Sequence, residues 1–388
     1  MAVKSLSLYI HIPFCRSFCD YCDFYSVLPG TVNDDFPDFY INAVLADIRS
    51  QTVFFNVENI PAVYIGGGTP SALGARRMKN LLDGLRDISC FKPVEFTTEA
   101  NPESLNEDFL AVCKESGVNR ISLGIQSFDE TVLAAVNRYG NARVFDEKLR
   151  LVSQFFPRAF SVDLITGLPY QNEQIVKSDI RKLLFYKPAH VSLYSLIPEE
   201  GTPLKKKIDD KTVSLPDDSD SLWLLGRNIL VNAGYEHYEV SSFALPGKRC
   251  LHNTRYWNME GWLGAGPRAS GTISCGNAFR YTYPDDVHSY VNCINPFVNL
   301  ALREELDRIM LIKDSILTGY RTIDGPDEAV FKKRFGINIE DCIGETMSAW
   351  RKKGFFNGTK PAGELMLFLN DFLCDAFNEI DHTKSKRL

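Results

Sequence analysis

The sequence has no long hydrophobic run: no window approaches the roughly eighteen uninterrupted apolar residues that a membrane-spanning helix needs. The opening residues, MAVKSLSLYIHIPF, contain a single lysine and an apolar stretch that is too short for a signal peptide. We therefore expect a soluble, cytoplasmic protein with no membrane span.

An excess of positive charge is also missing. The chain has 43 Lys and Arg residues against 49 Asp and Glu residues, a formal net charge of -6, and its basic residues are scattered. Binding to a nucleic-acid backbone needs clustered basic residues, so we expect no nucleic-acid partner. The phosphate-binding pattern G-x-x-x-x-G-K followed by Ser or Thr is absent as well, which disfavours a nucleoside triphosphatase.

Short apolar stretches alternate with amphipathic helical patterns over the first half of the chain. The six expected strands cover residues 6–12, 62–66, 94–99, 120–126, 161–166 and 191–197. This alternation predicts an α/β fold with a parallel sheet and outer helices, and the nearly continuous apolar strands indicate that both sheet faces are covered. Six units rather than eight suggest an open, partial (β/α)6 barrel.

The βα alternation ends near residue 235. A polar segment at 205–221, interpreted as a surface loop, and a helical pattern at 222–233 precede this point. We predict two domains, residues 1–235 and residues 236–388, of which the second is smaller, mixed and mostly helical.

Three of the ten cysteines, Cys15, Cys19 and Cys22, follow the first expected strand within eight positions. A structural zinc site needs two ligand pairs, yet the next cysteine along the chain is Cys90. Three thiolates are one fewer than the four that saturate an iron–sulfur cluster, so one iron would stay open. The alternatives are a zinc site without a visible fourth ligand, or surface thiols. In a parallel barrel the carboxyl ends of the strands form the active face, and this loop belongs there.

Several further stretches place polar residues at strand ends: GGGTPS, EANPE, GIQSF and VDLITGLP. Together with YIHIPFCRSFCDYCDF and CLHNTRYW, they give the chain a resemblance to the radical S-adenosylmethionine (SAM) superfamily. Within it, the chain is similar to the family of anaerobic coproporphyrinogen III oxidases (HemN type) and HemW heme chaperones. The resemblance extends from residue 5 to about 270. It implies a [4Fe–4S] cluster on Cys15, Cys19 and Cys22, whose open iron binds SAM.

Carried over by motif, the resemblance also implies a set of SAM contacts. These are Tyr9, Tyr21, Gly67, Gly68, Thr69, Glu99, Gln126, Arg138 and Asp163. The chemistry of three of them agrees, because Glu99 and Asp163 can accept from ribose hydroxyls or an amino group and Arg138 can donate to a carboxylate. The alternative for each is a structural carboxylate or a surface ion pair.

Two features favour the HemW branch over the oxidase branch. The oxidase type resembles a four-cysteine pattern whose last position is Phe24 here, and it carries a long N-terminal arm, whereas the first strand here is expected close to Met1. The HemW resemblance implies heme binding, transfer of heme to an acceptor protein, and an electron donor such as flavodoxin or ferredoxin. The enzymatic alternative is an oxygen-independent coproporphyrinogen III oxidase or another radical SAM enzyme of tetrapyrrole metabolism, such as a methyltransferase. A structural zinc protein is the alternative from another class.

The sequence HNTRYW begins at His252, which we predict to be the heme ligand. An imidazole is a common axial ligand of heme iron, and aromatic faces can cover a porphyrin. The alternative is that His252 and Asn253 form a turn while Tyr256 and Trp257 are core residues. Family members usually continue with Gly-Ala-His-Ser, but this chain has no histidine in GAGPRASG (264–271). We hypothesise that Arg268 meets a heme propionate instead.

Overall fold

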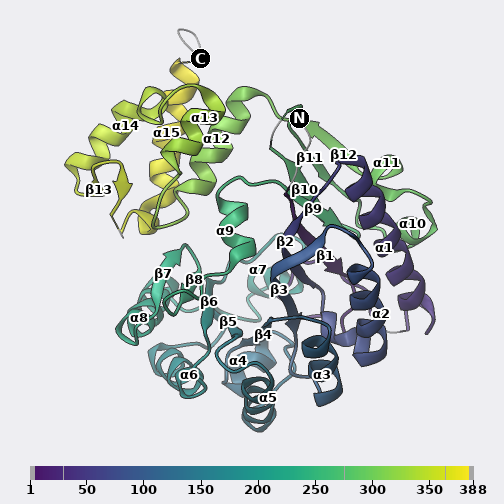
Figure 1. The fold of residues 1–388 in the computed structure, drawn as a ribbon. Coiled ribbons are helices and arrows are strands. Elements are labelled where there is room, and N and C mark those ends of the chain that lie inside the picture. The colour runs from purple at the N-terminus through teal and green to yellow at the C-terminus, as the bar shows by residue number, and fades with distance from the viewer. Residues whose placement is uncertain (1–4, 29, 275, 363, 384–388) are drawn as a thin grey trace.

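The computed structural model describes residues 5–28, 30–274, 276–362 and 364–383. Within these residues, six parallel strands follow one another in sheet order, with helices between them (Figure 1). The strands are β1 (Ser7–Ile12), β2 (Ile60–Gly67), β3 (Phe91–Ala100), β4 (Arg120–Gln126), β5 (Phe160–Thr166) and β6 (His190–Ser195). The predicted partial barrel of six βα units is confirmed.

Helices cover the outside of the barrel. They are α1 (Phe36–Phe54), α2 (Gly74–Arg86), α3 (Glu107–Glu115), α4 (Glu130–Ala135), α5 (Ala142–Phe155), α6 (Glu173–Phe185) and α8 (Ser219–Asn232). Asparagine side chains fix where α3, α5 and α6 begin: Asn106, Asn141 and Asn172 each accept from a backbone N–H of the first turn. The segment 205–221 is not a loop throughout: a short helix α7 (Pro203–Asp209), capped by Thr202, covers its beginning, and α8 starts before its end.

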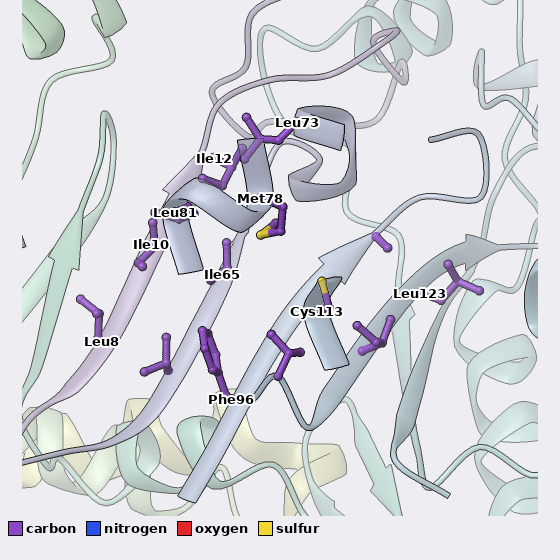
Figure 2. Packing of buried hydrophobic residues seen from close by; sticks show 14 of the residues in the cluster. Leu8, Ile10, Ile12, Ile65, Leu73, Met78, Leu81, Phe96, Cys113 and Leu123 are labelled. Carbon is purple, nitrogen blue, oxygen red and sulfur yellow. The ribbon is translucent and has the colours of Figure 1, made fainter. Parts of the chain in front are cut away.

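The two faces of the sheet have different chemistry. Leu8, Ile10 and Ile12 of β1 point outward and pack near Met78 and Leu81 of α2 (Figure 2). The alternate β1 residues, such as Tyr9 and His11, point to the concave face. The outer face is covered, as expected, whereas the concave face is polar rather than apolar. Because side chains alternate along a strand, one set of residues faces the core and the other set faces the candidate site.

Further strands extend the sheet beyond β6 at one edge and beyond β1 at the other. β7 (Glu236–Glu239) and β8 (Ser242–Ala244) extend it beyond β6. At the other edge β9 (Trp262–Ala265) pairs in parallel with β1, and β10 (Ser270–Ile273), β11 (Phe279–Thr282) and β12 (Leu302–Glu305) follow. The predicted division between residues 235 and 236 falls at the beginning of β7, inside this sheet, and stays a prediction.

A buried polar network fastens this added sheet to α1. The carboxylate of Asp47 accepts from the hydroxyls of Tyr283 and Tyr290, each at 2.7 Å, and from the backbone N–H of Phe297. The amide of Gln51 donates to the carbonyl of Gly264 on β9 at 3.0 Å. Short helices α10 (Val287–Asn292) and α11 (Pro296–Asn299) complete this region.

The last part of the chain has a hydrophobic core of its own, which includes Ile312, Trp350 and Phe372. It consists of α12 (Arg308–Gly319), α13 (Glu328–Phe335), α14 (Glu340–Lys352), the hairpin β13 (Phe356–Asn357) and β14 (Lys360–Pro361), and α15 (Leu369–Thr383). Figure 1 shows this unit beside the barrel, with α9 (Leu251–Trp257) between the two. No helix in the described part of the chain is long and apolar enough to cross a membrane.

Candidate functional site

The loop that follows β1, residues 13–24, carries the three closely spaced cysteines and is called the cysteine loop below. Backbone hydrogen bonds hold it from several sides: Cys15 donates to the carbonyl of Val27 at 3.1 Å, and Asp20 donates to the carbonyl of Val136 at 2.9 Å. The side chain of Lys207 on α7 also donates to the carboxylate of Asp20, at 2.5 Å. The loop is therefore fixed to segments more than a hundred residues away.

The three thiols lie within electrostatic range of one another. Burial raises the pKa of Cys22 to about 11, and the neighbouring Cys19 and Cys15 add to the increase. Burial likewise raises the pKa of Cys15. Among the described residues, no three His, Cys, Asp or Glu side chains are close enough to hold a single metal ion. Three thiols from one loop are one fewer than the four ligands of a saturated [4Fe–4S] cluster, so this donor set is compatible with a cluster that leaves one iron open.

The glycines at the carboxyl end of β2 bring a second loop against the cysteine loop. Gly67 has a φ of +108°, which side-chain-bearing residues rarely adopt, and a Cβ on it would lie 2.5 Å from the His11 ring. A Cβ on Gly68 would lie 2.8 Å from the carbonyl oxygen of Ile12 and 3.1 Å from the sulfur of Cys15. Thr69 is buried, and its Oγ1 lies 3.5 Å from the same sulfur. This close approach needs glycine at both positions.

Glu99, at the end of β3, faces these glycines. Its Oε1 accepts from the hydroxyl of Tyr64 at 2.8 Å, and its Oε2 accepts from the backbone N–H of Gly67 at 3.2 Å. Burial, and then the charge of Asp163, raise the pKa of Glu99 to about 7. The carboxyl group therefore changes its protonation near neutral pH.

Arg138 approaches the cysteine loop from the segment between α4 and α5. It donates from Nη1 to the sulfur of Cys19 at 3.4 Å and from Nη2 to Oδ1 of Asn101 at 2.9 Å. Asn101 in turn donates to Oγ1 of Thr69 at 2.8 Å. The Nε of Arg138 is buried and has no hydrogen-bond partner among the described residues. One guanidinium N–H thus stays available to an acceptor on a ligand.

Gly124 on β4 makes room for this group. A Cβ at that position would lie 2.9 Å from Oδ1 of Asn101, 3.0 Å from Nε2 of Gln126 and 3.2 Å from Nη2 of Arg138. Gln126 itself has a φ of +70°, a left-handed conformation at the end of the strand. The structure therefore brings Gln126 and Arg138 together.

The remaining predicted SAM contacts lie around the same face. Burial raises the pKa of Tyr9, whose hydroxyl is 3.1 Å from Nδ1 of His11. Burial also raises the pKa of Tyr21, which neighbours Arg138 and Cys19. Asp163 on β5 accepts from the hydroxyl of Ser122 at 3.1 Å, and burial raises its pKa.

His252 lies deeper, on the concave face rather than at the mouth of the barrel. Its side chain is only 8% exposed, and its ring packs against Tyr64 with centroids 5.5 Å apart. The Nδ1 atom is buried without a hydrogen-bond partner in the described chain. Burial lowers the pKa of His252 to about 4, so the imidazole is neutral at pH 7.

Arg268 lies beside the cysteine loop, separate from His252. The loop from β9 to β10 carries it, and its guanidinium donates to Asp23 at 2.9 Å. Phe24, which occupies the position of the fourth oxidase cysteine, is 65% exposed.

Three residues of this region were not singled out from the sequence. Tyr64 precedes Gly66, the first glycine of GGGTPS, by two positions, and Asn101 belongs to the EANPE stretch, so motif position was a usable signal for both. Glu95 had no local signal. Its carboxylate accepts from the backbone N–H groups of Leu251 and His252, each at 2.9 Å, across a long sequence separation.

Comparison with known proteins agrees with this geometry. The radical SAM superfamily model matches residues 9–183. The heme chaperone HemW of Lactococcus lactis is 36% identical over 352 residues, covering 90% of this chain and 90% of that protein. The heme chaperone HemW of Escherichia coli is 37% identical over 286 residues, covering 72% of this chain and 71% of that protein.

Among solved structures, coproporphyrinogen III oxidase (HemN) from Escherichia coli has a TM-score of 0.82 at 20% identity, covering 97% of this chain and 91% of that one. This likeness concerns the fold alone, whereas the sequence relatives identify the branch. The chain belongs to the HemW heme chaperone family of the radical SAM superfamily.

Proposed function

We propose that this protein is a cytoplasmic heme chaperone that binds an iron–sulfur cluster, SAM and heme and delivers the heme to an acceptor protein. The observation that carries the heme assignment is the buried Nδ1 of His252, which has no partner among the described residues. Membership of the HemW family supports the same assignment. The nine described cysteines are free thiols, the state that cluster ligation requires and that a reducing cytoplasm maintains.

Cys15, Cys19 and Cys22 would hold the cluster at the carboxyl end of β1. When bound, the cluster and SAM supply one-electron chemistry at the SAM sulfonium. The side chains of this protein would bind and orient SAM. Glu99 and Asp163 offer hydrogen-bond acceptors, and the free Nε of Arg138 offers a donor. Tyr9, Tyr21, Thr69 and Gln126 form the rest of the proposed SAM contact set, and Gly67 and Gly68 leave room for the ligand.

We infer that the protein carries heme rather than acting as a catalyst. Phe24 in place of a fourth cysteine disfavours the oxidase alternative. A flavodoxin or ferredoxin would act as the electron donor to the cluster. At the exposed ion pair of Arg268 and Asp23, a heme propionate would compete with the Asp23 carboxylate for the Arg268 guanidinium.

An anaerobic heme titration of reconstituted protein tests the function. Wild type is compared with His252→Ala, and with His288→Ala as a control, because His288 is an exposed histidine of α10. We expect saturable binding of about one heme in wild type and the control, with loss in His252→Ala. Absence of heme binding together with release of 5'-deoxyadenosine from SAM would instead indicate a radical enzyme.

A further inference from the structure

Three side chains form a chain of hydrogen bonds between two thiols of the cysteine loop. Arg138 donates to the sulfur of Cys19 at 3.4 Å and to Oδ1 of Asn101 at 2.9 Å. Asn101 donates from Nδ2 to Oγ1 of Thr69 at 2.8 Å, and that oxygen lies 3.5 Å from the sulfur of Cys15. The contacts therefore run from the loop after β1 across the segments that follow β4, β3 and β2, and back to the loop after β1.

The chemistry of these groups decides the direction of each bond. A guanidinium has donors only, so the amide oxygen of Asn101 must face Arg138 and its NH₂ group must face Thr69. The oxygen of Thr69 then accepts from the amide, which leaves the hydrogen of its own hydroxyl for the sulfur of Cys15. A thiolate that binds iron carries no proton and can only accept. With iron on Cys15, the hydroxyl of Thr69 is therefore the donor.

Backbone contacts hold the two central side chains in place. The N–H of Asn101 donates to Oγ of Ser71 at 3.1 Å, and its carbonyl oxygen accepts from two N–H groups of the turn that follows, each at 3.1 Å. The N–H of Thr69 donates at 2.8 Å to the carbonyl of Phe14, the neighbour of Cys15. Thr69 is 1% exposed, so bulk water does not compete for its hydroxyl.

We propose that Asn101 is a positioning residue that holds the hydroxyl of Thr69 as a donor to Cys15 and thereby raises the reduction potential of the cluster. The proposal rests on the proposed function, which places the cluster on Cys15, Cys19 and Cys22. A hydrogen bond to a ligating sulfur stabilises the reduced state, because the added electron increases the negative charge on that sulfur. Thr69 thus has a role besides its proposed contact with SAM.

The first measurement is a redox titration of reconstituted, SAM-free protein with dithionite, followed by electron paramagnetic resonance. Thr69→Val removes the hydroxyl but keeps the branched shape, and the extended backbone at this position suits valine. We expect the equilibrium between oxidised and reduced cluster to shift about tenfold toward the oxidised form, which lowers the potential by about 59 mV for one electron. Thr69→Ser retains the hydroxyl and should keep the potential of wild type. Thr318→Val is the matched control, because Thr318 is a buried threonine of α12.

The second measurement determines whether Asn101 acts through Thr69. In Asn101→Asp, one carboxylate oxygen accepts from Arg138 and the other accepts from the hydroxyl of Thr69, which then turns away from Cys15. In the Thr69→Val background the same substitution adds only its negative charge. Asn101→Asp should therefore shift the redox equilibrium about tenfold further when Thr69 is present than in Thr69→Val.

Equal shifts of Asn101→Asp in the two backgrounds would overturn the role of Asn101, as would a wild-type potential in Thr69→Val. Iron and sulfide analysis and thermal unfolding verify that each variant retains its cluster and its fold. Thr69→Ala, with the same expected shift, replaces Thr69→Val if that variant loses iron. A wild-type protein that takes up no iron and sulfide would instead refute the proposed function.

Discussion

The guanidinium of Arg138 donates to the sulfur of Cys19 across 3.4 Å, although 119 positions separate the two residues. The guanidinium therefore contacts one of the three thiols that are proposed to bind the cluster. Among the described residues, the Nε of the same side chain lacks a partner. Arg138 thus faces the proposed cluster and the proposed SAM site at once.

Arg138→Gln should lower the reduction potential of the reconstituted cluster, because removing a nearby positive charge disfavours the added electron. It should also weaken SAM binding about tenfold through loss of a charge-assisted hydrogen bond. Arg138→Lys retains the charge and should restore most of the potential but not the affinity. A redox titration followed by electron paramagnetic resonance measures the first effect. Arg150→Gln, on the outer face of α5, serves as the control, and a potential equal to that of wild type in Arg138→Gln would contradict the prediction.

Cys19→Ala should abolish the broad absorption near roughly 400 nm after reconstitution, because two thiolates cannot hold the cuboidal cluster. Cys374→Ala is the matched control, since Cys374 is an exposed cysteine of α15 far along the chain from the cysteine loop. Iron and sulfide analysis checks the result. A full complement of both in Cys19→Ala would remove the cluster assignment, and zinc without iron in wild type would favour a structural zinc protein.

SAM binding should strengthen as the pH rises through about 7, the pKa to which burial raises Glu99. Below that pH the carboxyl group is mostly protonated, so its electrostatic attraction for a cationic ligand is weaker. Between pH 6 and 7.5 the ionised fraction grows by roughly fivefold to tenfold, and the affinity should follow it. Dialysis at several pH values measures this, and the pH dependence should flatten in Glu99→Gln. A wild-type affinity that stays constant over this range would count against direct contact between Glu99 and SAM.

The free energy of unfolding should fall as the pH rises from about 4 to about 6 because of Asp47. Burial raises its pKa from 3.8 to about 6 in the folded protein, so the folded state holds a proton that the unfolded state releases. The stabilisation is therefore present below the unfolded pKa and is lost as the pH passes the folded one. The change is on the order of 3 kcal/mol. Urea unfolding of wild type and Asp47→Asn measures it, and equal pH slopes for the two proteins would refute the assignment.

Most of the barrel could be predicted from the sequence because its strands are locally apolar and its helices are amphipathic. The expected strand at 120–126 coincides with β4, and the others differ from the observed strands by a few residues at their ends. β9 to β12 could not be predicted in this way. Each has four residues, and partners distant in the sequence, such as β1 for β9, decide their pairing.

The residues of the candidate site also divide into those that a local sequence signal identifies and those that only the fold brings together. The cysteine spacing and GGGTPS are local signals, so the cysteines and glycines could be identified directly. The contact of Glu95 with the backbone of His252 spans 157 positions, and only the fold brings the two together. The sequence predicts His252 as a candidate heme ligand, but its burial is a property of the fold.

The place of β1 in the sheet has a consequence for synthesis on the ribosome. One edge of β1 pairs with β2, but the other waits for β9, whose Trp262 pairs with Ser7. At a translation rate of roughly 5–20 residues per second, about 250 further residues take on the order of ten to fifty seconds to emerge. For that time the nascent chain exposes an unpaired strand edge next to the cysteine loop, a template for aggregation. The edge of the first strand is therefore closed only late in synthesis, once β9 has emerged.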